Sequence, residues 1–166
     1  AEDGQAFLAE ARVMLADCRL SVGDAVGAKD AAEAALRGDQ SYPVARLALA
    51  AAHFALCELD EAAKEARRVI ELERGLADAH HLLARTAQAK GEMDVAEPAF
   101  EEAHALAPER FPLPYRIGAA RFLELVNEAR KELPPVVEEA IAGVDLRIEA
   151  RPDLEVLREQ DMPVPP

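Results

Sequence analysis

Small residues recur in this chain at intervals of 34 positions. Ala28, Ala62 and Ala96 keep this spacing. Two further columns have the same period, one of Gly or Cys (Gly23, Cys57 and Gly91) and one of Leu-Ala pairs (Leu15-Ala16, Leu49-Ala50 and Leu83-Ala84). A period of this size is typical of solenoids, in which copies of one small unit stack on one another. The spacing predicts three copies, at residues 9–42, 43–76 and 77–110.

Each copy has the pattern of two helices joined by a short turn. In the first copy we expect helices at residues 9–22 and 25–37, with Gly23 and Asp24 between them. Asp60 and Asp94 are predicted to be the N-caps of the second helices of the later copies, and Pro98 to lie in the first turn of its helix. The chain contains 36 Ala in 166 residues, and Ala favours helices and lets their backbones approach closely. The prediction is an all-α fold.

With these columns the chain resembles the tetratricopeptide repeat, a family of stacked helical hairpins. The family's small residues match Ala16, Ala50 and Ala84 in the first helices. The family's large aromatic residues are missing here, and only Pro108 matches its proline near the end of each copy. The resemblance implies a solenoid of three hairpins followed by a capping helix. It also implies non-catalytic protein binding, with the chain as a scaffold for a protein or peptide segment.

In that family the first helix of each copy lines a concave groove that binds partners. The resemblance places six candidate partner-binding residues there: Val44, Leu47, Ala51, Phe54, His81 and Arg85. The middle of this set is apolar, so we expect a partner segment with an apolar centre. Phe54 and Leu47 would anchor it from an exposed position, and Arg85 would offer a charge contact at one end. The alternative is that Phe54 and Leu47 pack under the chain's own C-terminal segment.

One subclass of the family grips the terminal carboxylate of a chaperone with a clamp of Lys, Asn and Arg. The matching positions in this chain are Val13, Asp17, Ala48, Asp78 and Leu82. None of them provides a basic or amide side chain, and the two acidic residues would repel a carboxylate. The sequence therefore disfavours binding of chaperone tails.

No pattern of catalytic, metal-binding or cofactor-binding residues emerges from the sequence. The four histidines lack the spacing of a zinc helix, neither Cys has a neighbouring His, and no phosphate-binding loop is present. We therefore expect a protein that is not an enzyme and has no metal or cofactor. A net charge of −13 disfavours nucleic acid and anionic membranes. With no visible signal peptide we expect a cytoplasmic location, although a chain that begins with Ala1 can be a processed form or part of a longer protein.

The composition changes near residue 110. Residues 1–110 contain 30 of the 36 Ala, whereas 8 of the 11 Pro follow them. We expect a capping or linking helix within 111–131, beginning at about Pro114, and then an α/β appendage at 132–166 with a short helix at 136–142. The alternating residues Val144–Glu149 predict one strand, before a Pro-rich tail. A single strand must pair, so the strand predicts self-association or an appendage completed by residues beyond 166.

The C-terminal segment also resembles the opening of a small zincin-like metallopeptidase family. The resemblance rests on Phe122, Leu125, Val126, Leu133-Pro134 and the strand pattern Val144–Glu149. The zinc helix of that family, His-Glu-x-x-His, is absent, so no catalytic residue can be transferred. The alternative function is therefore a recruiting or regulatory arm of a zinc peptidase whose catalytic part lies beyond residue 166.

Overall fold

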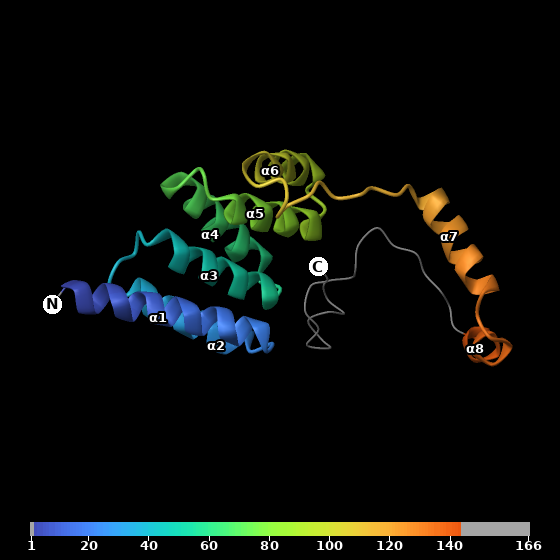
Figure 1. Cartoon of the computed structure of the whole chain (residues 1–166), viewed down its shortest axis with the longest axis horizontal. Helices are drawn as coiled ribbons and strands as arrows, with labels where there is room; N and C mark the ends of the chain where they lie inside the picture. The colour runs from blue at the N-terminus through green and yellow to red at the C-terminus, as the bar shows by residue number, and fades with distance from the viewer. Residues whose placement is uncertain (1, 144–166) are drawn as a thin grey trace. The chain divides into compact units, whose positions relative to one another are not determined.

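The computed structural model describes residues 2–143, and this part of the chain is helical without a strand (Figure 1). Its helices are α1 (Glu2–Ser21), α2 (Ala25–Leu36), α3 (Pro43–Ala55), α4 (Leu59–Leu72), α5 (Ala77–Lys90), α6 (Met93–Leu106), α7 (Ala119–Lys131) and α8 (Pro135–Ile141). They separate into two compact units, one ending at Leu113 and the other beginning at Pro114. The predicted strand Val144–Glu149 and the Pro-rich tail lie outside the described residues.

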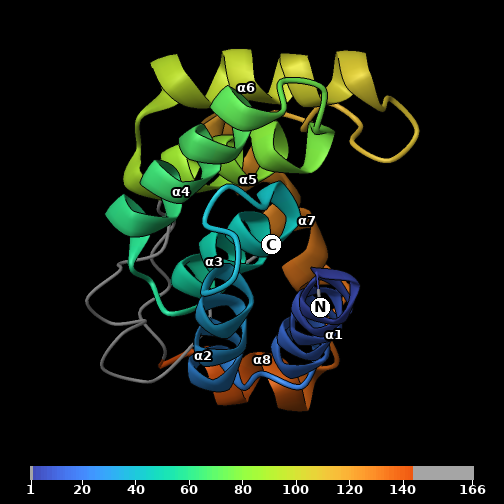
Figure 2. The ribbon, with the colours of Figure 1, turned by 90° about the vertical axis from the view of Figure 1, so that its left-hand side faces the viewer.

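The first unit is a solenoid of three helical hairpins, as the 34-residue period predicts. The hairpins are α1–α2, α3–α4 and α5–α6, and they stack in chain order with α1 and α2 at one end and α5 and α6 at the other (Figures 1 and 2). The second helix of each hairpin packs on the first helix of the next, α2 on α3 and α4 on α5. The first helices also contact one another, α1 with α3 and α3 with α5. The all-α, tetratricopeptide-like fold is confirmed.

The three turns inside the hairpins have the same backbone geometry. The φ angle is positive at Gly23 (84°), Cys57 (57°) and Gly91 (80°), which are the residues of one repeat column. The following N–H donates to the carbonyl five residues earlier in every copy, with N···O distances of 2.9 Å. A left-handed residue at a helix end is strained unless it is Gly, so Cys57 keeps the geometry at a cost of about 1–2 kcal/mol.

This turn geometry also decides where the second helices begin. Each starts two residues after the left-handed residue, so α4 begins at Leu59 and α6 at Met93. The predicted N-caps Asp60 and Asp94 are therefore wrong, because both residues lie inside the first turn. Pro98 lies in the second turn of α6, as its sixth residue, and not in the first turn as predicted. In the first copy Asp24 caps α2, its Oδ1 accepting from the Gly27 N–H at 2.8 Å.

The hairpins are held together by buried Ala at the places where helices touch. Ala16, Ala50 and Ala62 are fully buried, as are the equivalent residues of the other copies. One core cluster spans α1 to α3 and another spans α3 to α6. Because Ala allows short distances between helix axes, much of the cohesion comes from close backbone approach rather than from large side chains.

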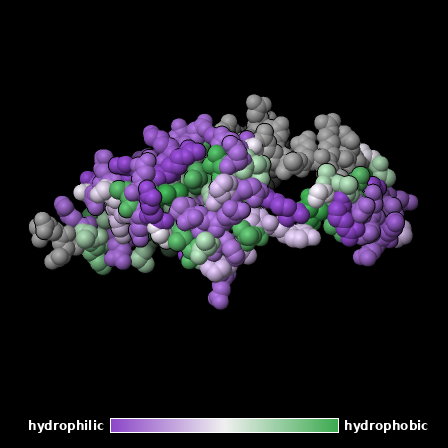
Figure 3. All heavy atoms as spheres, turned by 90° about the horizontal axis from the view of Figure 1, so that it is seen from above, coloured by the Kyte–Doolittle hydropathy of each residue, from purple (hydrophilic) through white to green (hydrophobic). Residues whose placement is uncertain are grey.

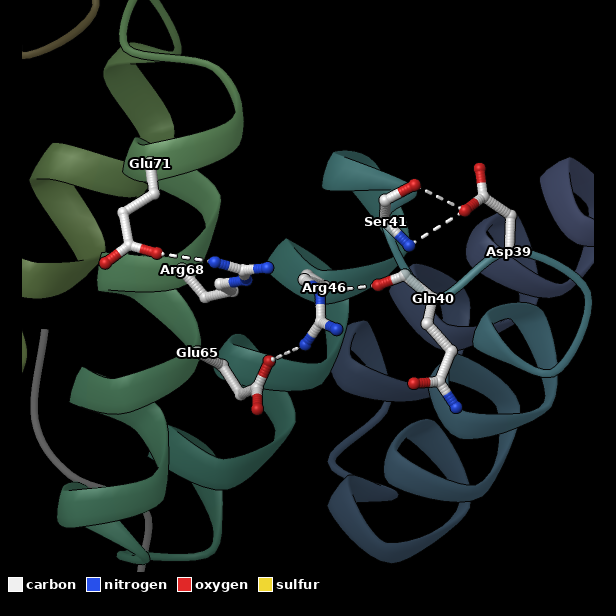
Figure 4. A network of polar contacts seen from close by, with 7 residues as sticks. All are labelled: Asp39, Gln40, Ser41, Arg46, Glu65, Arg68 and Glu71. Carbon is white, nitrogen blue, oxygen red and sulfur yellow. Dashed lines mark hydrogen bonds and ion pairs between the residues drawn. The ribbon is translucent and has the colours of Figure 1, made fainter.

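An arginine on α3 ties the second hairpin to the loop before it (Figure 4). The Arg46 guanidinium lies 2.6 Å from Glu65 on α4 and donates through Nε to the Gln40 carbonyl at 2.7 Å. In the same loop Asp39 accepts bonds from the backbone N–H and the hydroxyl of Ser41, and these bonds lower the pKa of Asp39. Arg46 and Glu65 are mostly buried, so they satisfy each other's charge where water has little access.

The second unit consists of α7 and α8, neither of which contains a buried residue. We predicted a helix from about Pro114, but residues 112–118 are not helical and α7 begins at Ala119. Pro112 and Pro114 disfavour helical geometry at Phe111 and Leu113, the residues before them, and nothing in the structure explains why residues 115–118 are not helical. The capping role of this helix stays a prediction. No helix of the described residues is both long and apolar enough to span a bilayer.

Candidate partner-binding face

An apolar strip follows the outer side of α3, in the middle of the face that α1, α3 and α5 form. Val44 is 42% exposed, and Leu47 and Ala51 are half-buried. Their spacing of three and four residues places them on one side of the helix. Leu47 and Ala51 also pack against the core cluster of the second and third hairpins. The strip is thus held rigidly while part of its apolar surface stays open to solvent.

Phe54 lies three residues after Ala51 on the same side of α3, but its side chain is not accessible to a partner. It is only 6% exposed and belongs to the core cluster that spans α3 to α6. The Arg85 guanidinium from α5 covers the ring, with Cζ 4.7 Å from its centroid. The expectation of an exposed Phe54 is therefore wrong, because the neighbouring first helix supplies a side chain long enough to close over it. Whether Phe54 takes part in binding stays a prediction.

Arg85 is the residue of this face with the least usual environment. Burial lowers the pKa of its guanidinium, and no Asp or Glu of the described chain forms an ion pair with it. A guanidinium remains charged in proteins, so this half-buried cation is stabilised here by the ring of Phe54 and by whatever water reaches it. In a chain of net charge −13, Arg85 is thus a cation on the candidate face that no described acidic residue pairs with.

The start of α5 is covered by the segment that follows α6. The Phe111 ring stacks on His81 with the centroids 4.5 Å apart, and Phe100 meets His81 edge-on at 5.9 Å. The Phe111 carbonyl lies 3.0 Å from Nδ1 of His104, which holds the segment in place. Burial, and then the nearby Arg85, lower the pKa of His81. His81 therefore favours the neutral form in which it can stack closely.

The neighbouring Asp78 is also engaged from within the chain. Both carboxylate oxygens of Asp78 meet Arg110, at 2.6 and 2.8 Å. The chain's own residues 110–111 thus cover α5 at Asp78 and His81. The alternative expectation placed such a cover over Phe54 and Leu47. The sequence signal that was missed is the Arg-Phe pair at the end of the last repeat, Arg110 and Phe111.

The positions of the chaperone-tail clamp are equally unsuited in the structure. Val13, Ala48 and Leu82 are buried, and Asp78 is paired with Arg110. Asp17 is exposed, and partial burial raises the pKa of its carboxyl group. Within the described residues, no three His, Cys, Asp or Glu side chains gather as a metal site would require.

Comparison with solved structures identifies proteins of similar architecture. The chain is similar to two structures of MamA, one at 25% identity and a TM-score of 0.56 over 60% of this chain and 58% of that one. The other has 21% identity and a TM-score of 0.53, over 66% and 60% of the two chains. It is also similar to the first tetratricopeptide repeat domain of Spaghetti (RPAP3), bound to the HSP90 peptide SRMEEVD, at 18% identity and a TM-score of 0.59. That match covers 76% of this chain and 96% of the other.

These matches agree with the tetratricopeptide-like fold of the first unit. The chain spans about three fifths of the length of the MamA chains. No family model matches the sequence, and no curated protein matches it either. The zincin-like resemblance of the C-terminal segment receives no support from these comparisons, and part of it lies outside the described residues.

Proposed function

We propose that this chain is a non-catalytic protein-interaction module that binds a partner segment on the face of α1, α3 and α5. The observation that carries the proposal is Arg85, a half-buried cation with no acidic partner in the described chain, at the end of the apolar strip Val44, Leu47 and Ala51. The partner is an extended or helical peptide with apolar side chains against the strip and a carboxylate at Arg85. The peptide-bound RPAP3 domain supports this use of the fold.

The partner differs from the chaperone tail seen in that structure. Four of the five clamp positions are buried or engaged here and the fifth, Asp17, is an exposed acid, so Arg85 alone would bind the carboxylate, rather than a set of basic side chains. Long-range repulsion from the acidic chain also works against a highly acidic ligand. The apolar part of the peptide must therefore supply most of the affinity, which we expect to be micromolar, about 8 kcal/mol.

The experiment is a selection of displayed random peptides on the full chain, followed by affinity measurement with the selected peptide. We expect peptides with one acidic residue beside apolar residues, and Arg85→Gln should weaken their binding about 10-fold or more, as expected for loss of a charged hydrogen bond. Arg68→Gln is the matched control, because Arg68 is an exposed cation on α4 that pairs with Glu71. Selected peptides that bind both variants equally would refute the role of Arg85.

Val44→Ser separates the strip from the charge. It removes exposed apolar surface without disturbing the core, since Val44 is 42% exposed. Weaker binding at unchanged stability would support the strip as part of the site. Binding that Val44→Ser and Arg85→Gln both leave intact would place the peptide elsewhere and overturn the proposed face.

A further inference from the structure

α1 has an apolar face on the side turned away from its own hairpin. Its inward side buries Val13 and Ala16, as a first helix should. On the opposite side Phe7 is 72% exposed, Met14 63% and Leu15 44%. Ala11 and Cys18 are exposed as well and complete a stripe with helical spacing, and Val22, in the turn directly after α1, is exposed beside its end. We call this surface the α1 apolar face: Phe7, Ala11, Met14, Leu15, Cys18 and Val22. A stripe of this kind on a soluble helix marks a contact surface.

The repeat register shows what covers the same stripe in the other hairpins. Adding 34 or 68 to the central residues gives Ala45, Ala48, Leu49 and Ala52 on α3, and Ala79, Leu82, Leu83 and Thr86 on α5. All eight are buried, with exposed fractions of at most 8%. On α3 the four residues share a core cluster with residues of α2, and on α5 Leu82 and Leu83 share a cluster with residues of α4, in each case the second helix of the preceding hairpin. The α1 apolar face is therefore a packing surface of known geometry.

The other end of the solenoid is built differently. Ala63 on α4 is 2% exposed, whereas the equivalent position of α6 is Glu97, which is exposed. Seen from the side where α6 lies in Figure 1, hydrophilic residues cover much of the surface (Figure 3). A terminal repeat of a solenoid needs a polar outer face when no other element covers it. α6 comes closer to this condition than α1, because four acidic residues are exposed on it beside Met93 (39%) and Leu106 (41%): Asp94, Glu97, Glu101 and Glu102.

We propose that the α1 apolar face docks an amphipathic helix with a small-residue side, packed on α1 as α2 packs on α3. The bulky side chains Met14 and Leu15 would fit between alanines of that helix, as Leu82 and Leu83 fit against α4. The helical part of the face, from Phe7 to Cys18, is about 17 Å long and accommodates a helix of about 11 residues. A second copy of α1 is the poorer occupant, since it would oppose bulky side chains to bulky side chains.

A basic residue should help to place the docked helix. Nζ of Lys29 on α2 lies 2.8 Å from Oε2 of Glu58, the residue directly before α4. The residue equivalent to Glu58 in the first copy is Asp24. A lysine at the matching position of the docked helix would therefore reach Asp24, which is exposed and lies beside the end of the α1 apolar face.

The test replaces residues 1–8, and with them Phe7, by a second copy of residues 43–76, so that an added α4 enters the repeat register over the central part of the face, from Ala11 to Cys18. The added copy carries Cys57→Gly, which leaves the exposed Cys18 as the fast-reacting thiol because the original Cys57 is buried. We expect Cys18 to react with a thiol reagent at least 10-fold more slowly than in the unmodified chain, and the urea midpoint to rise. The matched control adds Ala63→Glu in the new hairpin, copying Glu97 of α6, and should restore fast labelling.

A peptide of Leu59–Leu72 added to the full chain measures the same docking without a new covalent link. Protection of Cys18 by the peptide at up to about 1 mM, lost with Ala63→Glu, supports the proposal. Unprotected Cys18 in both formats overturns it. Sedimentation of the unmodified chain gives the remaining outcome: a concentration-dependent dimer that protects Cys18 would make a second copy the occupant and refute the helix partner.

Discussion

The two core clusters of the solenoid are filled by different side chains. The cluster from α3 to α6 contains two aromatic rings, Phe54 and Phe100, together with leucines and alanines. In the cluster from α1 to α3 the largest buried side chains are those of Leu36 and Leu49, alanine dominates the rest, and the aromatic ring of Tyr42, which packs against it, is only partly buried. A buried aromatic ring removes 150–250 Å² from water, several times what a methyl group does. The first hairpin therefore depends more on close helix contact.

The difference has a consequence for local stability. Hydrophobic contributions scale with buried apolar area, so we expect the α5–α6 end to open at higher free energy than the α1–α2 end. The outward face of α1 adds to this contrast, since its apolar residues contribute nothing to stability while they stay exposed. The following predictions test the contrast by changing one side chain in each region.

The largest effect is expected for Phe54→Ala. The ring is 6% exposed and lies under Arg85, so its removal should lower the free energy of unfolding by about 3–5 kcal/mol. Phe7→Ala is the matched control, because Phe7 is 72% exposed and its loss should change stability by less than about 0.5 kcal/mol. Urea midpoints of the two variants give the comparison. Equal midpoints would show that Phe54 is not part of a tight core.

Overpacking of the alanine-rich cluster should have an intermediate effect. Ala16 on α1 is fully buried, so Ala16→Leu should cost about 1–3 kcal/mol by forcing α1 and α2 apart. Ala11→Leu places the same side chain on the exposed side of α1 and should leave the urea midpoint nearly unchanged. A neutral Ala16→Leu would mean that the first hairpin yields easily, and would sharpen the contrast between the two clusters.

A smaller effect is expected in the first turn. Gly23 has φ of 84° with open space around its Cβ position, so Gly23→Ala should cost about 1 kcal/mol through backbone strain alone. Gly38→Ala also meets open space, at a φ that other residues adopt, and should be neutral or slightly stabilising. Thermal unfolding of both variants measures the difference. Equal melting temperatures would contradict the strain assigned to Cys57 at the equivalent position.

The 34-residue period was enough to predict the hairpins because it records where helices touch. Ala16, Ala50 and Ala62 lie at close contacts whose geometry repeats, so the sequence shows them as columns. Residue type alone could not predict the N-caps, because the left-handed residue of each turn sets where the next helix begins. The cover over the start of α5 was also missed, because Arg110 and Phe111 make their contacts in one repeat and so do not recur at the 34-residue period.

The candidate face was predictable in outline and not in detail. Helical spacing identifies Val44, Leu47 and Ala51 as one strip, since that depends only on α3. The burial of Phe54 depends on Arg85, which lies 31 positions later and reaches it only because α3 and α5 are neighbours. Contacts between side chains of different repeats are tertiary events that a period does not encode.

The smallest predicted effect concerns the pKa of His81. The α1 end of the solenoid has no equivalent histidine. Burial under Phe111 lowers the pKa of His81, Arg85 and Arg110 add to this, and Asp78 opposes them. The folded state thus takes up a proton at lower pH than the unfolded chain, whose His has a pKa of about 6.5. The stabilisation by neutral His81 is complete above that pH and is lost as the pH falls towards the folded-state pKa.

Nuclear magnetic resonance titration of the His81 ring tests this directly. We expect its midpoint below the ordinary value in the unmodified chain and closer to it in Phe111→Ala, because removal of the stacked ring lets water reach the imidazole. Lowering the pH from about 7 to 5 should lower the urea midpoint less in His81→Gln than in the unmodified chain. The carboxylates are the same in both proteins, so their contribution cancels in this comparison. A His81 titration that Phe111→Ala leaves unchanged would mean that the segment after α6 does not seal the start of α5. The contrast between the two ends of the solenoid would then rest on their core clusters alone.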